Sequence, residues 1–117
     1  MKKLFVYGIL RKQYGAGRLL SDDDYKGQYK TAPKYTMVSL NAFPGMLKDG
    51  DNSITGDLFE TDSDTISKTD AMEGHPTFYE RQEVELEDGT IAEAYFLSRE
   101  EYGHFPEVKS GDWLNKN

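Results

Sequence analysis

The sequence of 117 residues contains no cysteine. This absence excludes disulfides, thiolate metal sites and cysteine nucleophiles together, and it suits a reducing compartment, so we expect a cytoplasmic protein. Histidine is almost as scarce. The two histidines, His75 and His104, lack the close spacing of a metal-binding pair. We therefore expect neither a metal site nor a cofactor that depends on one.

Basic residues are few relative to acidic ones. Fourteen Lys and Arg against 21 Asp and Glu give a formal net charge of −7, which opposes binding to a nucleic-acid backbone. Long apolar runs are also missing. Arg11 and Lys12 interrupt the first apolar stretch too early for a signal peptide, and no run approaches a membrane span. We expect neither nucleic acid nor a membrane as a partner.

Several well-known motifs of catalysis are absent. The sequence has no Gly-x-Ser-x-Gly elbow, no Walker loop and no Gly-x-Gly-x-x-Gly fingerprint, so serine hydrolase, phosphate-loop and dinucleotide functions have no support. It also has no internal repeat, linker or low-complexity tract. We expect a single domain over residues 1–117, long enough to bury roughly two-thirds of the surface of its unfolded chain.

Short β-prone segments make up most of the chain. Strands are predicted over residues 3–7, 29–40 with a break at Pro33, 54–60, 82–86 and 90–97, and Asp88-Gly89 predicts a tight hairpin turn. We expect a loop over residues 10–20, a turn at 43–45 and a polar connection at 48–52. Trp113 is expected to pin the C-terminal segment to the body.

One helix of about eleven residues is predicted, with Asp62 or Ser63 as its N-cap and Gly74 and Pro76 closing it. Helical spacing places four residues on one face: Ile66, Thr69, Asp70 and Glu73. With the strands, this helix predicts an α+β fold, in which a mostly antiparallel sheet or partly closed β-barrel has the helix packed across it.

Glu73 is an unusual residue at its position. A carboxylate in the last turn of a helix meets partly negative carbonyls, at a cost of about 0.3–1 kcal/mol. If it also faces inward, desolvation favours the protonated form. Such departures from local preference are typical of functional sites. Asp70, on the same face, is expected to have a structural role: it could cap a neighbouring loop or accept a hydrogen bond from Arg81.

A second candidate feature is the turn Tyr7-Gly8-Ile9-Leu10, called here the 7–10 turn. Its successive backbone N–H groups can form a cradle for a carboxylate, with Gly8 supplying a permissive backbone. Tyr79 follows the loop after the helix. Its hydroxyl could reach a ligand near Glu73, or its ring could simply pack in the core, and the sequence leaves both open.

The sequence resembles the γ-glutamylcyclotransferase-like superfamily, particularly its γ-glutamylamine cyclotransferase and AIG2-like branch. The resemblance spans nearly the whole chain, and Tyr79 follows Glu73 at the expected interval. It rests on short motifs in a fixed order: Val6-Tyr7-Gly8-Ile9-Leu10-Arg11, Phe43-Pro44-Gly45, Gly56-Asp57-Leu58-Phe59, Asp70-Ala71-Met72-Glu73-Gly74, Tyr79-Glu80-Arg81 and Gly111-Asp112-Trp113. It implies a small mixed barrel flanked by helices.

The resemblance also implies site residues and a reaction. Tyr7, Gly8, Ile9 and Leu10 would bind a γ-glutamyl group, Glu73 would be the general acid/base, and Tyr79 would complete the site. The substrate's own α-amine attacks its γ-carbonyl, giving 5-oxoproline and a free amine, in a transferase- or lyase-type cleavage. This chemistry needs no metal, cofactor or enzymic nucleophile, because the carboxylate has only to move protons.

Two residues depart from the family pattern. Ile9 replaces a small hydroxylic residue, which puts substrate identity in question, and Thr69 replaces the usual leucine before Asp70. Two other functions stay open. One is a noncatalytic module that binds a small ligand in the same pocket. The other is the same chemistry on a γ-glutamyl group attached to a larger amine, such as a lysine side chain.

Overall fold

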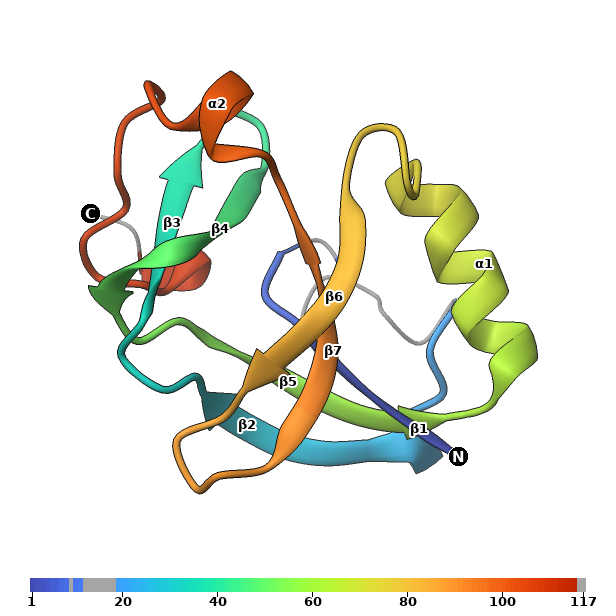
Figure 1. Cartoon of the computed structure of the whole chain (residues 1–117). Helices are drawn as coiled ribbons and strands as arrows, with labels where there is room; N and C mark the ends of the chain where they lie inside the picture. The colour runs from blue at the N-terminus through green and yellow to red at the C-terminus, as the bar shows by residue number, and fades with distance from the viewer. Residues whose placement is uncertain (9, 12–18, 116–117) are drawn as a thin grey trace.

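The computed structural model describes residues 1–8, 10–11 and 19–115. Its elements follow one another along the chain (Figure 1) as β1 (Lys2–Val6), β2 (Tyr25–Lys30), β3 (Tyr35–Ser39), β4 (Pro44–Asn52), β5 (Thr55–Thr61), α1 (Ser63–Glu73), β6 (Glu80–Glu85), β7 (Ile91–Phe96) and α2 (Arg99–Tyr102), with 3-10 turns at Asp22–Asp24 and Trp113–Asn115. The fold is α+β with one main helix, as the sequence predicted.

The strands form two sheets. Five of them lie in the order β2-β5-β1-β7-β6, and β3 and β4 form a separate pair. All neighbours pair antiparallel except β1 and β7, which are parallel. The predicted break at Pro33 separates β2 from β3 and so divides the two sheets. The hairpin of β6 and β7 turns at Gly89, whose positive φ of 89° matches the Asp-Gly prediction.

A closed barrel does not form among the described residues. The outer strands of the larger sheet meet at one end only, where Thr31 forms an isolated bridge with Leu86. Two backbone bonds flank it, from the N–H of Ala32 to the Glu85 carbonyl and from that of Glu87 to the Lys30 carbonyl. The larger sheet is therefore a mostly antiparallel, partly closed sheet, within the range that the sequence predicted.

Helix α1 forms where the sequence predicted it. The Asp62 side chain accepts a hydrogen bond from the Thr65 N–H at 2.8 Å, and Gly74 ends the helix in the left-handed conformation at φ 71°. Its inner face buries Ile66 and Thr69. Ile66 packs in one cluster with Leu4, Phe59 and Tyr95, so the helix lies over β1, β5 and β7.

The predicted polar connection at 48–52 was wrong, because these residues belong to β4. Asn52 pairs with Tyr35 and Leu47 pairs with Thr36, so the four residues between them bulge out of the ladder. Local bonds fix the bulge, since the Thr36 hydroxyl and an Arg99 N–H both donate to the Asp49 carbonyl. Charged, glycine-containing sequence favours a loop locally, and these long-range bonds override it.

Two further differences concern boundaries. The turn expected at 43–45 lies earlier, where the N–H of Leu40 donates to the Phe43 carbonyl and Asn41 adopts a positive φ of 79°. Strand β2 begins at Tyr25, before the predicted start at residue 29. The short helix α2 was not predicted; at four residues it is too short to show a period.

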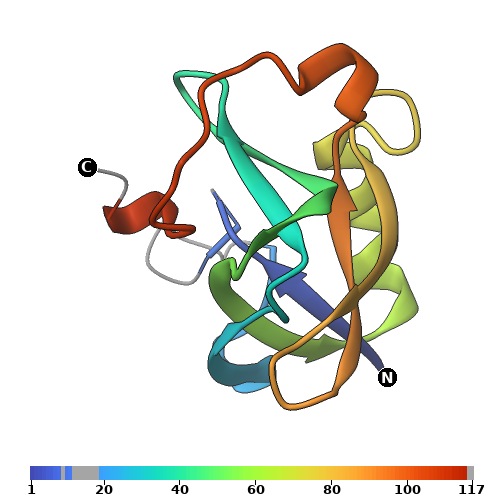
Figure 2. The ribbon, with the colours of Figure 1, turned by 60° about the vertical axis from the view of Figure 1, so that its left-hand side comes forward.

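The C-terminal segment is tied to both sheets. Figure 2 shows the chain after α2 passing alongside β3, where the Val108 N–H donates to the Met37 carbonyl. Trp113 is buried in the core, as predicted. Gly111 has a φ of 70°, and a Cβ there would come 2.2 Å from the Ser53 carbonyl oxygen, so only glycine fits this contact with the chain before β5.

No helix in the described ranges has the length and apolar character needed to cross a membrane.

Candidate active site

One cavity of about 180 Å³ collects the residues that the sequence singled out. It lies between the end of β1, the start of β4, the last turn of α1 and the loop that leads to β6. Its described lining residues are Phe5, Val6, Tyr7, Gly8, Leu10, Phe43, Pro44, Met72, Glu73, Phe78, Tyr79 and Tyr95. Most of these side chains are apolar, so a charge placed here is poorly solvated.

Glu73 is the one carboxylate on this lining. Its carboxyl forms no hydrogen bond or ion pair with any described residue, and burial alone raises the pKa of this carboxyl from 4.5 to about 7. It stands in the last turn of α1, one residue before the helix-ending Gly74. A side chain with this pKa can both accept and donate a proton near neutral pH.

The structure brings four of the five predicted binding residues to the same cavity. Tyr7, Gly8, Leu10 and Tyr79 line it together with Glu73. Ile9 lies outside the described residues. More than 60 positions separate the 7–10 turn from Glu73 in the sequence. They lie close together in the fold because α1 packs over β1.

The Tyr7 hydroxyl fixes the end of β1. It donates to the Tyr95 carbonyl at 2.6 Å and accepts from the Met46 N–H at 2.9 Å, so it joins β7 and β4. Burial raises its pKa well above the usual range, with smaller contributions from Tyr79 and Glu73. The next residue, Gly8, approaches Pro44 so closely that a Cβ would lie 2.9 Å from the proline Cγ.

Replacing Tyr7 with Phe is expected to lower the free energy of unfolding by about 1–3 kcal/mol, because it leaves a buried carbonyl and a buried N–H without their partner. Urea denaturation of both proteins would measure the loss. Tyr29→Phe is the matched control, since the Tyr29 hydroxyl has no hydrogen bond among the described residues and its ring is only partly buried. Equal stability of the two variants would contradict the assigned bonds.

Tyr79 uses its hydroxyl within the protein. The hydroxyl donates to the Pro44 carbonyl at 2.6 Å, and burial, then the Glu73 charge, raise its pKa. The hydroxyl therefore has no second proton to donate to a ligand. Its ring faces the cavity, and one oxygen lone pair stays available to a donor.

Arg11 anchors the 7–10 turn from behind, a role that the sequence did not predict. Its backbone N–H donates to the Gly8 carbonyl at 3.0 Å. Its buried guanidinium donates to Asp112 at 3.0 Å and lies 3.5 Å from Asp57 of β5. Two distant segments therefore hold the turn in place. The sequence did contain a signal for this role, because Arg11 and Asp112 each belong to one of the short motifs that resemble the family.

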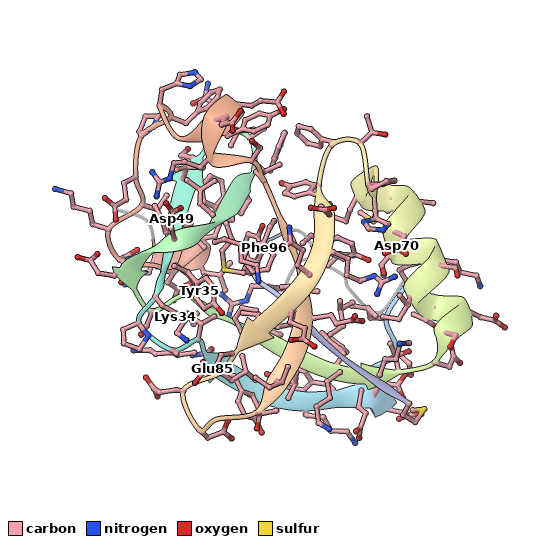
Figure 3. All side chains as sticks on the ribbon, in the orientation of Figure 1. Lys34, Tyr35, Asp49, Asp70, Glu85 and Phe96 are labelled. Carbon is pink, nitrogen blue, oxygen red and sulfur yellow. The ribbon has the colours of Figure 1, made fainter. Side chains whose placement is uncertain are left out.

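A second ionic network holds the helix end that carries Glu73. Arg81 of β6 binds Asp70 through two bonds, Nε to Oδ1 at 2.8 Å and Nη2 to Oδ2 at 3.0 Å, and reaches Glu93 at 2.9 Å. Asp70 lies on the side of α1 that faces β6 (Figure 3). Burial raises the Asp70 pKa, but hydrogen bonds from Arg81 and Tyr95 outweigh it and hold that pKa below its usual range.

The unusual Thr69 belongs to this network. Its hydroxyl lies 2.6 Å from the Tyr95 hydroxyl, which donates to Asp70 at 2.7 Å, and 2.9 Å from the Ile66 carbonyl. With the Tyr95 proton on Asp70, the single Thr69 proton is shared between the Tyr95 oxygen and the Ile66 carbonyl. Leucine would remove the hydroxyl contact to Tyr95, so Thr69 adds a polar link between α1 and β7. The expected structural bond between Asp70 and Arg81 is confirmed.

Sequence reasoning missed the apolar wall of the cavity, formed by Phe43, Pro44, Met72, Phe78 and Tyr95. Phe43 and Pro44 belong to a motif that resembles the family, but nothing in their position along the sequence indicated that they lie near Glu73. The part of the chain that the structure describes holds no group of three or more His, Asp or Glu arranged to bind a metal ion.

Comparison with known proteins identifies relatives along the whole chain. A provisionally named gamma-glutamylcyclotransferase of Vibrio cholerae is 30% identical over 113 residues, covering 97% of this chain and 96% of the relative. A protein of Methanocaldococcus jannaschii with the same provisional name is 35% identical over 122 residues, covering 97% and 96%.

A solved structure from a protein with a similar sequence has the same fold. The solution structure of YtfP from Escherichia coli superposes with a TM-score of 0.73 at 26% identity, covering 97% of both chains. The signature of the gamma-glutamyl cyclotransferase, AIG2-like family matches residues 4–115. With this match over nearly its full length, the chain belongs to the AIG2-like gamma-glutamyl cyclotransferase family.

Proposed function

We propose that this protein is a γ-glutamyl cyclotransferase that acts on a γ-glutamylamine or γ-glutamyl-amino acid and releases 5-oxoproline and a free amine. The observation that carries the proposal is Glu73, an unpaired carboxyl among the described residues, on a mostly apolar cavity shared with the 7–10 turn. Membership of the family supports the reaction class.

The attacking nitrogen loses two protons in this reaction. The substrate's α-ammonium first gives one proton to the Glu73 carboxylate, and the freed amine attacks the γ-carbonyl carbon to form the new C–N bond. The protonated Glu73 gives this proton to the leaving nitrogen as the original C–N bond breaks. The Glu73 carboxylate then takes the second proton from the new ring nitrogen and passes it to solvent. No water is consumed, and Glu73 returns to its starting state.

The position of the Glu73 pKa suits both steps. A carboxyl with a pKa of about 7 is a stronger base than an ordinary glutamate and is still acidic enough to protonate a leaving nitrogen. An exposed glutamate with a pKa near 4.5 would accept the proton poorly. Burial of Glu73 is therefore what fits it to both roles.

In the proposed complex, the 7–10 turn binds the α-carboxylate of the γ-glutamyl group through its backbone N–H groups. Tyr7, Gly8, Ile9 and Leu10 would hold this half of the substrate, and the Tyr79 ring would cover it. Fixing the carboxylate holds the α-amine near the γ-carbonyl, so orientation supplies much of the rate gain.

The test is mass-spectrometric detection of 5-oxoproline from a set of γ-glutamyl amides, followed by a pH profile on the best substrate. We expect kcat/KM to fall about tenfold for each pH unit below about 7, as the Glu73 carboxylate becomes protonated and stops accepting protons. A profile that is flat between pH 5 and 8 would contradict this role of Glu73. Binding of these amides with no turnover would instead identify a noncatalytic module.

A further inference from the structure

The cavity that Glu73 lines is also lined by three apolar residues, Phe43, Met72 and Phe78. We call the part of the cavity that these three residues line the apolar exit. Met72 and Phe78 are also exposed to solvent, by 51% and 37%, which makes them two of the four large hydrophobic residues exposed in the described part of the chain. Exposed apolar side chains that gather at the mouth of one cavity indicate a surface for an apolar ligand.

Contacts between aromatic rings fix the position of Phe78 at the apolar exit. The Phe78 ring meets three others edge to face, at centroid distances of 6.0 Å to Phe43, 4.9 Å to Tyr79 and 5.7 Å to Tyr102. The rings come from the β3–β4 connection, the loop before β6 and α2, which lie at the same end of the molecule in both views (Figures 1 and 2). We call Phe43, Phe78, Tyr79 and Tyr102 the aromatic rim.

The charges around the cavity disfavour an ionic occupant of the exit. No Lys or Arg is found among the described lining residues, so a carboxylate on the leaving group would lack a counter-ion there. Nearby cations are already paired, Arg81 with Asp70 and Glu93, and Arg99 with Asp49. A cationic leaving group would stabilise ionised Glu73 and weaken it as the acid that must protonate the leaving nitrogen.

We propose, resting on the cyclotransferase function above, that the leaving group is a neutral apolar amine, bound between Phe43, Met72 and Phe78 with an aromatic ring as the best fit. The γ-glutamyl half occupies the 7–10 turn, and the scissile C–N bond lies beside Glu73. The rim can place a further ring in the edge-to-face arrangement that its own rings already show.

Four amides that share the γ-glutamyl half test this specificity: γ-glutamyl-phenethylamide, γ-glutamyl-methylamide, γ-glutamylputrescine and γ-glutamylglycine. The readout is kcat/KM for 5-oxoproline release by the full chain. We expect the phenethylamide to exceed each of the other three by about tenfold or more, since apolar contacts of a few carbon groups discriminate on that scale.

Phe78→Ser tests whether the rim causes the preference. The ratio of kcat/KM for the phenethylamide to that for the methylamide is expected to fall about tenfold in this variant. The matched control is Ile91→Ser, which removes an exposed apolar side chain of β7, 52% exposed and outside this cavity. This control is expected to keep the wild-type ratio.

The outcomes separate this inference from the function on which it rests. If 5-oxoproline is released but γ-glutamylputrescine or γ-glutamylglycine is turned over as fast as the phenethylamide or faster, the apolar leaving group is wrong. The proposed cyclotransferase function is then still supported. An unchanged ratio in Phe78→Ser overturns the role of the rim. Absence of 5-oxoproline from all four amides overturns the proposed function and this inference with it.

Discussion

Release of 5-oxoproline from γ-glutamyl amides is expected to fall by about 100- to 10,000-fold when Glu73 is replaced with Gln, the usual scale for loss of a general acid/base. Glutamine keeps the size and the polar end of the side chain but carries no exchangeable acidic proton. Since no other carboxyl lies on the described cavity lining, no described neighbour can take over the transfer. The measurement is kcat/KM on the best amide of the panel.

A matched variant separates this effect from general damage. Glu87→Gln makes the same chemical change at an exposed position in the β6–β7 turn region, away from the cavity, and is expected to keep wild-type activity. Circular dichroism of both variants checks that they fold. If Glu73→Gln retained activity within a few-fold of Glu87→Gln, Glu73 would not be the proton carrier.

The same substitution is expected to make the folded protein more stable at neutral and alkaline pH. Folding raises the Glu73 pKa from 4.5 to about 7, so between these values the folded chain binds more protons than the unfolded one. Stability from this group therefore falls as pH rises from about 4.5 to about 7. At about 1.36 kcal/mol for each pH unit, the ionised carboxylate destabilises the fold by about 3 kcal/mol above pH 7.

Urea denaturation at several pH values would measure the destabilisation caused by the ionised Glu73 carboxylate. The free energy of unfolding of Glu73→Gln minus that of the wild type is expected to increase by about 3 kcal/mol between pH 4 and pH 8. Taking the difference cancels the other titrating groups. Glu87→Gln is expected to give a nearly constant difference over the same range. A constant difference for Glu73→Gln would mean that its carboxyl is well solvated.

Local signals made the helix and one hairpin predictable. Asp62 and Gly74 mark the two ends of α1 by side-chain and backbone chemistry that operates within four residues. The Asp88-Gly89 turn likewise depends only on a local backbone preference. The inward direction of Glu73 followed from helical spacing once those ends were known, which is why the site could be approached from sequence.

Long-range pairing set what the sequence did not reveal. The bulge in β4 is held by Thr36 and Arg99, one before it and the other about 50 residues after it. Arg11 meets Asp112 across 101 positions. Phe43 and Phe78 come from two loops that lie far apart in the sequence, and their rings meet only in the folded chain. No periodicity in a single sequence reports such contacts, so the apolar wall and the anchor of the 7–10 turn needed the structure.

Gly74 separates Glu73 on a rigid helix from Phe78 on the loop that follows, with a gap of only four residues between the two side chains. The acid is oriented by α1 and its ionic network, whereas the rim residue is carried by a segment outside any helix or strand. Exchange of that loop between relatives could therefore retune which amines are accepted while preserving the proton chemistry, giving evolution or protein engineering a small, separable module to vary.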